Sequence, residues 1–194
     1  MERIIYDKMK ACGLDHVIMN LHLQAYSFAH QFVHGKTVLD AACGTGFGSM
    51  IYSTGAKSII AVDKDEKAIS RGRELPSFCP ITFEVKDLDK DILPEADVCV
   101  SVETIEHLNG GGFFLKNLRV KQLVFTIPLG PLDQENSFHK LEFMTPDAAI
   151  AFFTDCGWPI ITGVARESRI AANFENGPGI FVYNMMLGMA ERGK

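Results

Sequence analysis

Short apolar runs alternate with amphipathic stretches over most of the chain, and this alternation predicts the fold. The apolar runs predict strands at 37–40, 58–63, 81–86, 97–102 and 122–127. The stretches before and between them predict helices over 15–33, from a glycine-rich turn to 54, over 66–75 and over 104–119, the last interrupted by three glycines. Near-continuous apolar strands separated by helices are typical of an α/β protein whose parallel sheet is covered on both faces.

The C-terminal part of the pattern differs from the rest. The hydrophobic residues in 129–144 show no regular spacing. An irregular stretch of this length in a compact domain is usually functional or a lid. Thr145 and Pro146 have the chemistry of a helix start. The runs 160–166 and 180–187 are separated by a turn rich in Gly, Pro and Asn, so they predict two antiparallel strands.

Composition is that of a single-domain globular protein. The chain has 194 residues, of which 47% are hydrophobic and 22% charged. The net charge of -5 lacks the basic surplus of a general nucleic-acid binder, so we expect no nucleic-acid partner. The five cysteines are odd in number and include no CxxC pair, which disfavours a disulfide framework or a zinc knuckle.

The beginning of the chain bears on its location. The sequence MERIIYDKMK is charged from its second residue and has no apolar signal-peptide core. No apolar run approaches the length of a membrane helix. We therefore expect a cytoplasmic protein with reduced thiols and no membrane partner.

A glycine-rich turn, Cys43–Gly48, follows the first predicted strand and opens a helix. In an open α/β sheet, ligands bind at the carboxyl ends of the strands, and such a turn lets the backbone approach them closely. Asp63 ends the next predicted strand, where a carboxylate accepts hydrogen bonds from ribose hydroxyls. The G-x-G-x-G spacing differs from the dinucleotide pattern G-x-G-x-x-G, and no Lys follows as in a P-loop. A tight turn without a ligand is the alternative.

Four segments resemble those of one enzyme family. Val38–Gly48 looks like motif I of the class I S-adenosylmethionine (SAM) dependent methyltransferases, and Ala61–Asp65 is similar to the acidic end of their second strand. Lys86–Leu88 resembles their adenine-contacting segment, and Ser101–Leu108 the segment after their fourth strand. The resemblance covers residues 20–165. It implies a Rossmann-like, seven-stranded, mostly parallel sheet with helices on both faces and an antiparallel last strand.

The resemblance also implies a SAM site. Motif I would hold the methionine part of SAM, Asp63 the ribose and the segment at Asp87 the adenine. The residues implied to bind SAM are Tyr26, Asp40, Ala42, Gly44, Gly46, Asp63, Lys64, Asp87, Leu88 and Val102. The whole chain, 1–194, would form a single methyltransferase domain, with residues 1–35 as a helical cap over the cofactor.

Two carboxylates and two imidazoles are candidates for the chemistry. Glu103, Glu106 and His107 have the spacing of one helix face at the end of the fourth predicted strand. This E-x-x-E-H pattern resembles two kinds of metal-assisted O-methyltransferase, one acting on phenols and one on the 3′ ends of small RNAs. His139 would be a fourth ligand to Mg²⁺ or Mn²⁺. Alternatively, His107, His139 or Glu103 acts in catalysis without a metal, or the cluster is scaffold.

The function expected from these observations is methyl transfer from SAM, giving S-adenosylhomocysteine (SAH). We expect an oxygen of a small-molecule or glycan-type acceptor to receive the methyl group, with the protein a monomer or homodimer. Metal-assisted 2′-O-methylation of RNA and SAM binding without catalysis are the two alternatives. The acceptor itself has no signature in the sequence.

Overall fold

The computed structural model describes residues 15–130, 139–174 and 177–193. They form a seven-stranded sheet in the order β3-β2-β1-β4-β5-β7-β6. Strands β1 to β5 are parallel, and β7 lies antiparallel between β5 and β6. The predicted fold class is confirmed. The strands are β1 Thr37–Ala41, β2 Ser58–Asp63, β3 Ile81–Val85, β4 Val98–Val102, β5 Gln122–Leu129, β6 Ile160–Phe174 and β7 Gly177–Glu191.

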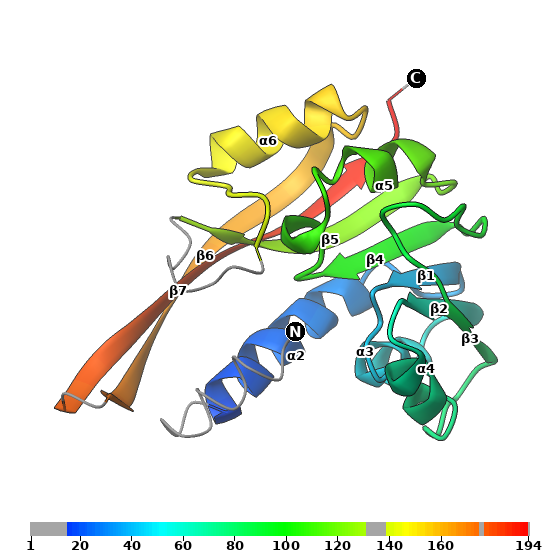
Figure 1. The fold of residues 1–194 in the computed structure, drawn as a ribbon, viewed down its shortest axis with the longest axis horizontal. Coiled ribbons are helices and arrows are strands. Elements are labelled where there is room, and N and C mark those ends of the chain that lie inside the picture. Colours follow the sequence, from blue (N-terminus) through cyan, green and yellow to red (C-terminus); the bar gives the residue numbers. More distant parts are fainter. Residues whose placement is uncertain (1–14, 131–138, 175–176, 194) are drawn as a thin grey trace.

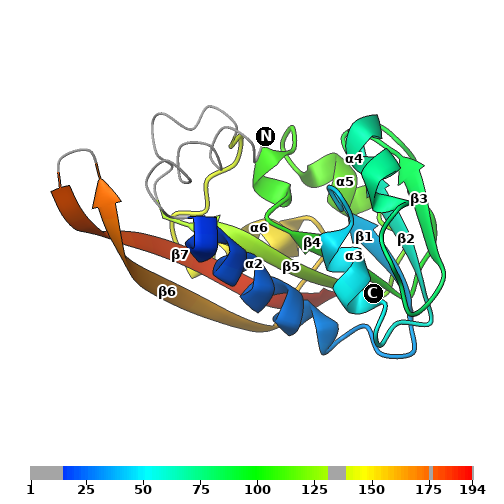
Figure 2. The same cartoon turned by 90° about the horizontal axis from the view of Figure 1, so that it is seen from below.

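Helices cover both faces of the sheet (Figures 1 and 2). One face carries α2, α3 and α4, and the other carries α5 and α6. The helical segments are α2 Asp15–His30, α3 Phe47–Tyr52, α4 Glu66–Gly72, the 3₁₀ turn η1 Ile105–His107, α5 Gly112–Asn117 and α6 Pro146–Asp155. None of the described helices is long and apolar enough to span a membrane.

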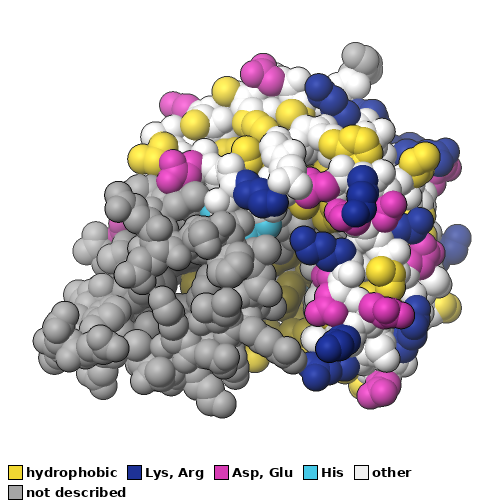
Figure 3. Space-filling view, viewed as in Figure 1, with side chains coloured by type: hydrophobic (Ala, Val, Ile, Leu, Met, Phe, Trp, Pro, Cys, Tyr) yellow, Lys and Arg dark blue, Asp and Glu magenta, His cyan; other side chains and the backbone are white. Residues whose placement is uncertain are grey.

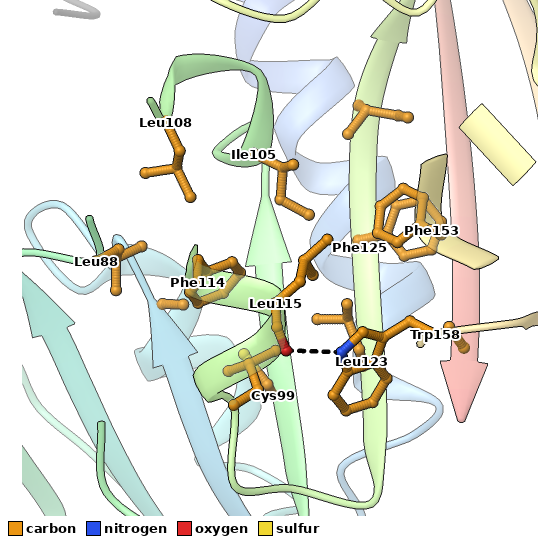
Figure 4. Packing of buried hydrophobic residues seen from close by; sticks show 14 of the residues in the cluster. Leu88, Cys99, Ile105, Leu108, Phe114, Leu115, Leu123, Phe125, Phe153 and Trp158 are labelled. Carbon is orange, nitrogen blue, oxygen red and sulfur yellow. Dashed lines mark hydrogen bonds between the residues drawn. The ribbon is translucent and has the colours of Figure 1, made fainter. Parts of the chain in front are cut away.

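Alternation along the central strands divides the core in two. In β5, Leu123 packs with the α5 and α6 side, whereas its neighbour Val124 packs with the α2 and α3 side. Figure 4 shows the first cluster, in which the Trp158 indole Nε1 donates a hydrogen bond of 2.8 Å to the Leu115 carbonyl. The loop after α6 is thereby fastened to α5.

Two predicted helix starts are present with their capping contacts. The Thr145 hydroxyl accepts a hydrogen bond from the Ala148 backbone N–H, and Pro146 occupies the first turn of α6. The Asp65 carboxylate caps α4 in the same way. These local signals position helices correctly because the cap and the N–H groups it satisfies lie within one turn.

The predicted interruption of the helical segment 104–119 by glycines is confirmed, because Gly110 and Gly111 have φ values of 81° and 62° and separate η1 from α5. The predicted ends of the C-terminal strands are wrong. Strand β5 does not end before Pro128 but continues through it to Leu129, paired with β7. The two C-terminal strands are also longer than the predicted 160–166 and 180–187.

The β6–β7 hairpin reaches beyond the rest of the sheet (Figures 1 and 2). β5 pairs with β7 only from Asn184 to Glu191, whereas β6 pairs with β7 out to Phe174 and Gly177. The distal half of the hairpin is therefore a two-stranded ribbon. The length of the two strands depends on their pairing with each other, so the apolar runs alone predicted strands that are too short.

Candidate active site

Backbone strain marks the point where the strand order reverses. The chain moves outward from β1 to β2 and β3 and then returns to place β4 on the other side of β1. Among the described residues, the non-glycine residues with positive φ are Ala42 (58°) and Glu103 (47°). They immediately follow β1 and β4, respectively. Such strain gathers at functional sites, and ligands of open α/β sheets bind at this switch point.

The glycine-rich turn is shaped by the residues around it. Gly46 has φ of 82°, and a Cβ on it would lie 2.7 Å from Cε1 of Phe83. Gly44 has φ of 55°, and a Cβ there would meet nothing within 4 Å. Gly46 is thus required by packing, whereas Gly44 borders open space at the site where the methionine part of SAM is predicted.

The Asp63 carboxylate at the end of β2 is held by backbone donors on both oxygens. Oδ2 accepts from Gly44 N at 2.9 Å, and Oδ1 accepts from Asp65 N at 2.8 Å. Each carboxylate oxygen has capacity for a further hydrogen bond. Asp63 can therefore bind ribose hydroxyls without releasing the glycine-rich turn.

Asp40, at the end of β1, is buried behind the same turn. Its Oδ2 accepts a 2.5 Å hydrogen bond from the Ser49 hydroxyl of α3. Burial raises the pKa of Asp40 from 3.8 to about 6; the Ser49 hydrogen bond opposes this shift, and the charge of Asp63 adds to it. The Asp40–Ser49 hydrogen bond therefore ties β1 to α3 across the glycine-rich turn.

The predicted adenine segment follows β3. Asp87 forms an ion pair with Lys90 at 3.0 Å and accepts a hydrogen bond from Asp89 N at 3.1 Å. These contacts lower the pKa of Asp87, with a smaller contribution from the charge of Lys64. The structure thus brings Lys64 toward Asp87. Leu88 packs into the core with only 5% of its surface exposed.

Tyr26 of α2 packs on the start of α3 and does not lie free over the turn. Its ring stands edge-on to those of Phe47 and Tyr52, each with centroids 6.0 Å away. A Cβ on Gly48 would lie 3.0 Å from Tyr26 Cε1. Val102, the last residue of β4, is partly buried on the same side of the sheet. The cofactor roles of these two residues stay predictions.

On the other side of the switch point lies a cluster of Glu106, His107 and His139. One potential ligand atom from each lies within 4.8 Å of the others. The two imidazole rings have centroids 4.6 Å apart, and His107 Nε2 is 3.7 Å from Glu106 Oε1. Figure 3 shows histidine surface on this face, with Lys and Arg side chains near it. Two segments far apart in sequence are therefore joined here.

The electrostatics of this cluster are set by burial. Glu106 has no exposed surface, and neither carboxylate oxygen has a hydrogen-bond partner among the described residues. Burial, and secondarily the charge of Glu103, raises the pKa of Glu106 well above its usual range. Burial, and secondarily His107, lowers the pKa of His139 to about 4. His139 is therefore neutral at neutral pH, and its lone pair is suited to a cation more than to a proton.

Glu103 departs from the prediction that it shares a helix face with Glu106 and His107. The helix begins only at Ile105, and the positive φ of Glu103 turns the backbone before it. Three of the four predicted metal ligands meet within 4.8 Å, and Glu103 is not among them. It remains close enough to influence the pKa of Glu106.

Sequence reasoning missed two residues that build the cofactor side. Ser49 holds Asp40, and Phe83 of β3 fills the space against Gly46. Neither belongs to a motif, and Phe83 comes from a strand two positions along the sheet. For Ser49, its place in the first turn of the helix after the glycines was the one sequence feature that could have indicated a contact with Asp40.

Comparisons with known proteins support the family resemblance. No family model matches the chain. Proteins from two strains of Mycobacterium tuberculosis, named probable S-adenosylmethionine-dependent methyltransferases, are each 32% identical over 105 residues, which is 48% of this chain and 38% of theirs. The chain thus matches well under half the length of these curated relatives.

Solved structures agree on the fold. A SAM-dependent methyltransferase from Mesorhizobium loti superposes with a TM-score of 0.63 at 17% identity, covering 87% of this chain and 98% of that one. One from Methanosarcina mazei gives 0.61 at 15% identity, covering 82% and 93%. The chain has the class I SAM-dependent methyltransferase fold. The resemblance predicted from the four sequence segments is confirmed.

Proposed function

We propose that this chain transfers a methyl group from SAM to an oxygen of a small-molecule or sugar-type acceptor and releases SAH. One observation carries the proposal: the switch point places the turn at Gly44 beside a Glu and His cluster, at the ends of adjacent strands β1 and β4. A SAM site at this turn and a proton-accepting or cation-binding site at the cluster would be neighbours, which supports methylation of a hydroxyl.

The proposal assigns separate roles in binding SAM and in activating the acceptor to different residues. SAM supplies an already activated methyl group, so positioning accounts for much of the catalysis. Asp63 and the backbone of the glycine-rich turn would orient the nucleoside and the methionine part. His107 or His139 would accept the hydroxyl proton of the acceptor, although the lowered pKa of His139 makes it a weak base and better suited to hold a cation.

A divalent cation fits the cluster as a second way to activate the acceptor. Glu106, His107 and His139 would hold Mg²⁺ or Mn²⁺, and the buried Glu106 oxygens would gain the partner they lack among the described residues. The cation would polarise the acceptor oxygen. The same donor set would suit an RNA 2′-hydroxyl, but the net charge of -5 favours a small acceptor.

The test is acceptor-dependent conversion of SAM to SAH. Purified protein would be incubated with labelled SAM and phenolic, catecholic or sugar acceptors, with and without Mn²⁺. The proposal expects label in an acceptor, and loss of that transfer in the Asp63→Ala variant. Tight SAH binding without transfer to any acceptor would favour a SAM-binding protein without catalysis. Transfer only to RNA would favour the nucleic-acid alternative.

A further inference from the structure

A relay of three polar side chains joins the turn after β3 to the segment that carries His139. Asn109 donates twice to Asp89, from its backbone N to Oδ1 and from Nδ2 to Oδ2, each at 2.8 Å. The Lys140 ammonium donates to Asn109 Oδ1 at 2.7 Å. The amide of Asn109 is thus the link between two segments that are otherwise separate in sequence.

Each end of the relay is attached to a functional segment. The Asp89 backbone N–H donates to Asp87, the residue predicted to contact adenine. The backbone N–H groups of Lys140 and Leu141 both donate to the Glu106 carbonyl, at 2.7 and 3.1 Å. Asn109 therefore connects the turn after β3 to the backbone at Lys140.

The relay is suited to positioning and contributes little to holding the fold together. Asn109 and Lys140 are exposed and Asp89 is half-buried. Exposed polar contacts add little to global stability because water competes for them. An asparagine is nevertheless specific here, because its side chain must donate to a carboxylate and accept from an ammonium at once.

We propose that Asn109 is a positioning residue that couples occupation of the adenine side to the placement of His139 and its segment. The proposal rests on the proposed function, since it takes SAM and SAH to bind against Asp87. Binding of SAH would hold the turn at Asp87–Asp89, the turn would hold Asn109, and Asn109 would hold Lys140. The segment that carries His139 would then open less often when the cofactor is bound.

Amide hydrogen exchange measures this coupling directly. The observable is the exchange rate of the Lys140 and Leu141 backbone amides, which bond to the Glu106 carbonyl. In the wild-type protein, saturating SAH is expected to slow their exchange by about fivefold or more. In Asn109→Ala, SAH is expected to bind within about threefold of wild-type affinity, and the slowing is expected to disappear.

Two further variants make the result specific. Lys140→Ala breaks the relay at its other end and is expected to abolish the slowing at Leu141. The swap of Asp89→Asn with Asn109→Asp keeps both side-chain contacts and is expected to restore it. Asn117→Ala is the matched control, because the Asn117 amide donates only to the Phe113 carbonyl within α5 among the described contacts. It is expected to behave as wild type.

The outcomes separate the two proposals. Slowing by SAH that persists in Asn109→Ala, or no slowing in a wild-type protein that binds SAH, overturns the relay and leaves the proposed function intact. Failure of the wild-type protein to bind SAH at all overturns the proposed function and the relay with it. Loss of slowing in Asn109→Ala with rescue by the swapped pair supports the relay.

Discussion

The two sides of the site differ in how their acidic groups are satisfied. On the cofactor side, both oxygens of Asp63 accept backbone hydrogen bonds, and Asp87 is paired with Lys90. On the acceptor side, Glu106 is buried without a hydrogen-bond partner for its carboxylate among the described residues. The acidic groups of the predicted cofactor side are paired as folded, whereas the proposed acceptor side holds a buried carboxyl that a proton or a cation would satisfy.

This difference leads us to expect different ligands on the two sides. A site whose polar groups are already oriented by backbone hydrogen bonds binds its ligand with little rearrangement. A buried carboxyl without a partner raises the energy of the folded protein, and a ligand that satisfies it recovers that energy. Substitutions that disrupt one side at a time test this contrast.

Asp63→Ala should have the largest effect, on SAH affinity. Loss of the ribose-facing carboxylate and of its hold on Gly44 should weaken binding by roughly 100-fold or more, because hydrogen bonds to charged groups contribute about 1.5–3 kcal/mol each. Calorimetric titration measures the change. Asp97→Ala is the control, since Asp97 accepts a similar backbone hydrogen bond from Thr37 at the amino end of β1. Equal losses in both variants would contradict the role of Asp63.

Asp40→Asn should raise stability at neutral pH. The pKa of Asp40 is about 6 in the folded protein against 3.8 ordinarily, so the folded state retains its proton over that window and loses stability as the pH rises through it. The amide removes this cost, which is worth up to roughly 3 kcal/mol at pH 7. Thermal unfolding should show a gain at pH 7 and none at pH 4. An equal gain at both pH values would contradict the burial of an ionised Asp40.

Glu106→Leu should stabilise the protein without ligands, by about 1–3 kcal/mol, because an apolar side chain replaces a buried carboxyl that has no described hydrogen-bond partner. The same variant should lose any cation binding. Denaturant unfolding and Mn²⁺ titration measure the two effects. Glu74→Leu, at an exposed position of the turn after α4, should change stability by less than about 0.5 kcal/mol. Destabilisation by Glu106→Leu would show that Glu106 is satisfied as folded.

Ala42→Gly should have the smallest effect. Ala42 has φ of 58°, a conformation that costs an L-residue roughly 1–2 kcal/mol and glycine almost nothing. After the entropy that glycine loses on folding, a gain of about 0.5–1 kcal/mol should remain. Thermal unfolding beside Ala56→Gly, a buried site without positive φ, tests the sign. A loss of stability in both variants would argue against strain at Ala42.

The local geometry around the predicted cofactor residues followed from the sequence more closely than that around Glu103, because the cofactor motifs are local. The strand, turn and helix around Gly44 and Gly46 are contiguous, and Asp63 ends the neighbouring strand, so short patterns define them. Glu103 was misplaced because its positive φ depends on the turn that links β4 to η1. Periodicity cannot reveal such a turn.

Long-range contacts account for the rest of what was missed. The contact between His139 and Glu106 was predicted only through the family resemblance, because the two residues are far apart in the sequence. Backbone hydrogen bonds from Lys140 and Leu141 to the Glu106 carbonyl bring them together in the fold. Asn109 and Ser49 carry no motif, and their partners come from other elements. The continuation of β5 through Pro128 depends on β7, which lies far along the chain.

Titration of Mn²⁺ into the SAH-loaded protein, followed by calorimetry, tests the contrast between the two sides most directly. We predict that SAH binds one-to-one in the absence of metal. Mn²⁺ should then bind saturably to the wild-type protein and to the Glu74→Leu control, and should not bind to Glu106→Leu. Absence of Mn²⁺ binding to the SAH-loaded wild type, or equal binding by Glu106→Leu, would contradict a cation-completed acceptor side.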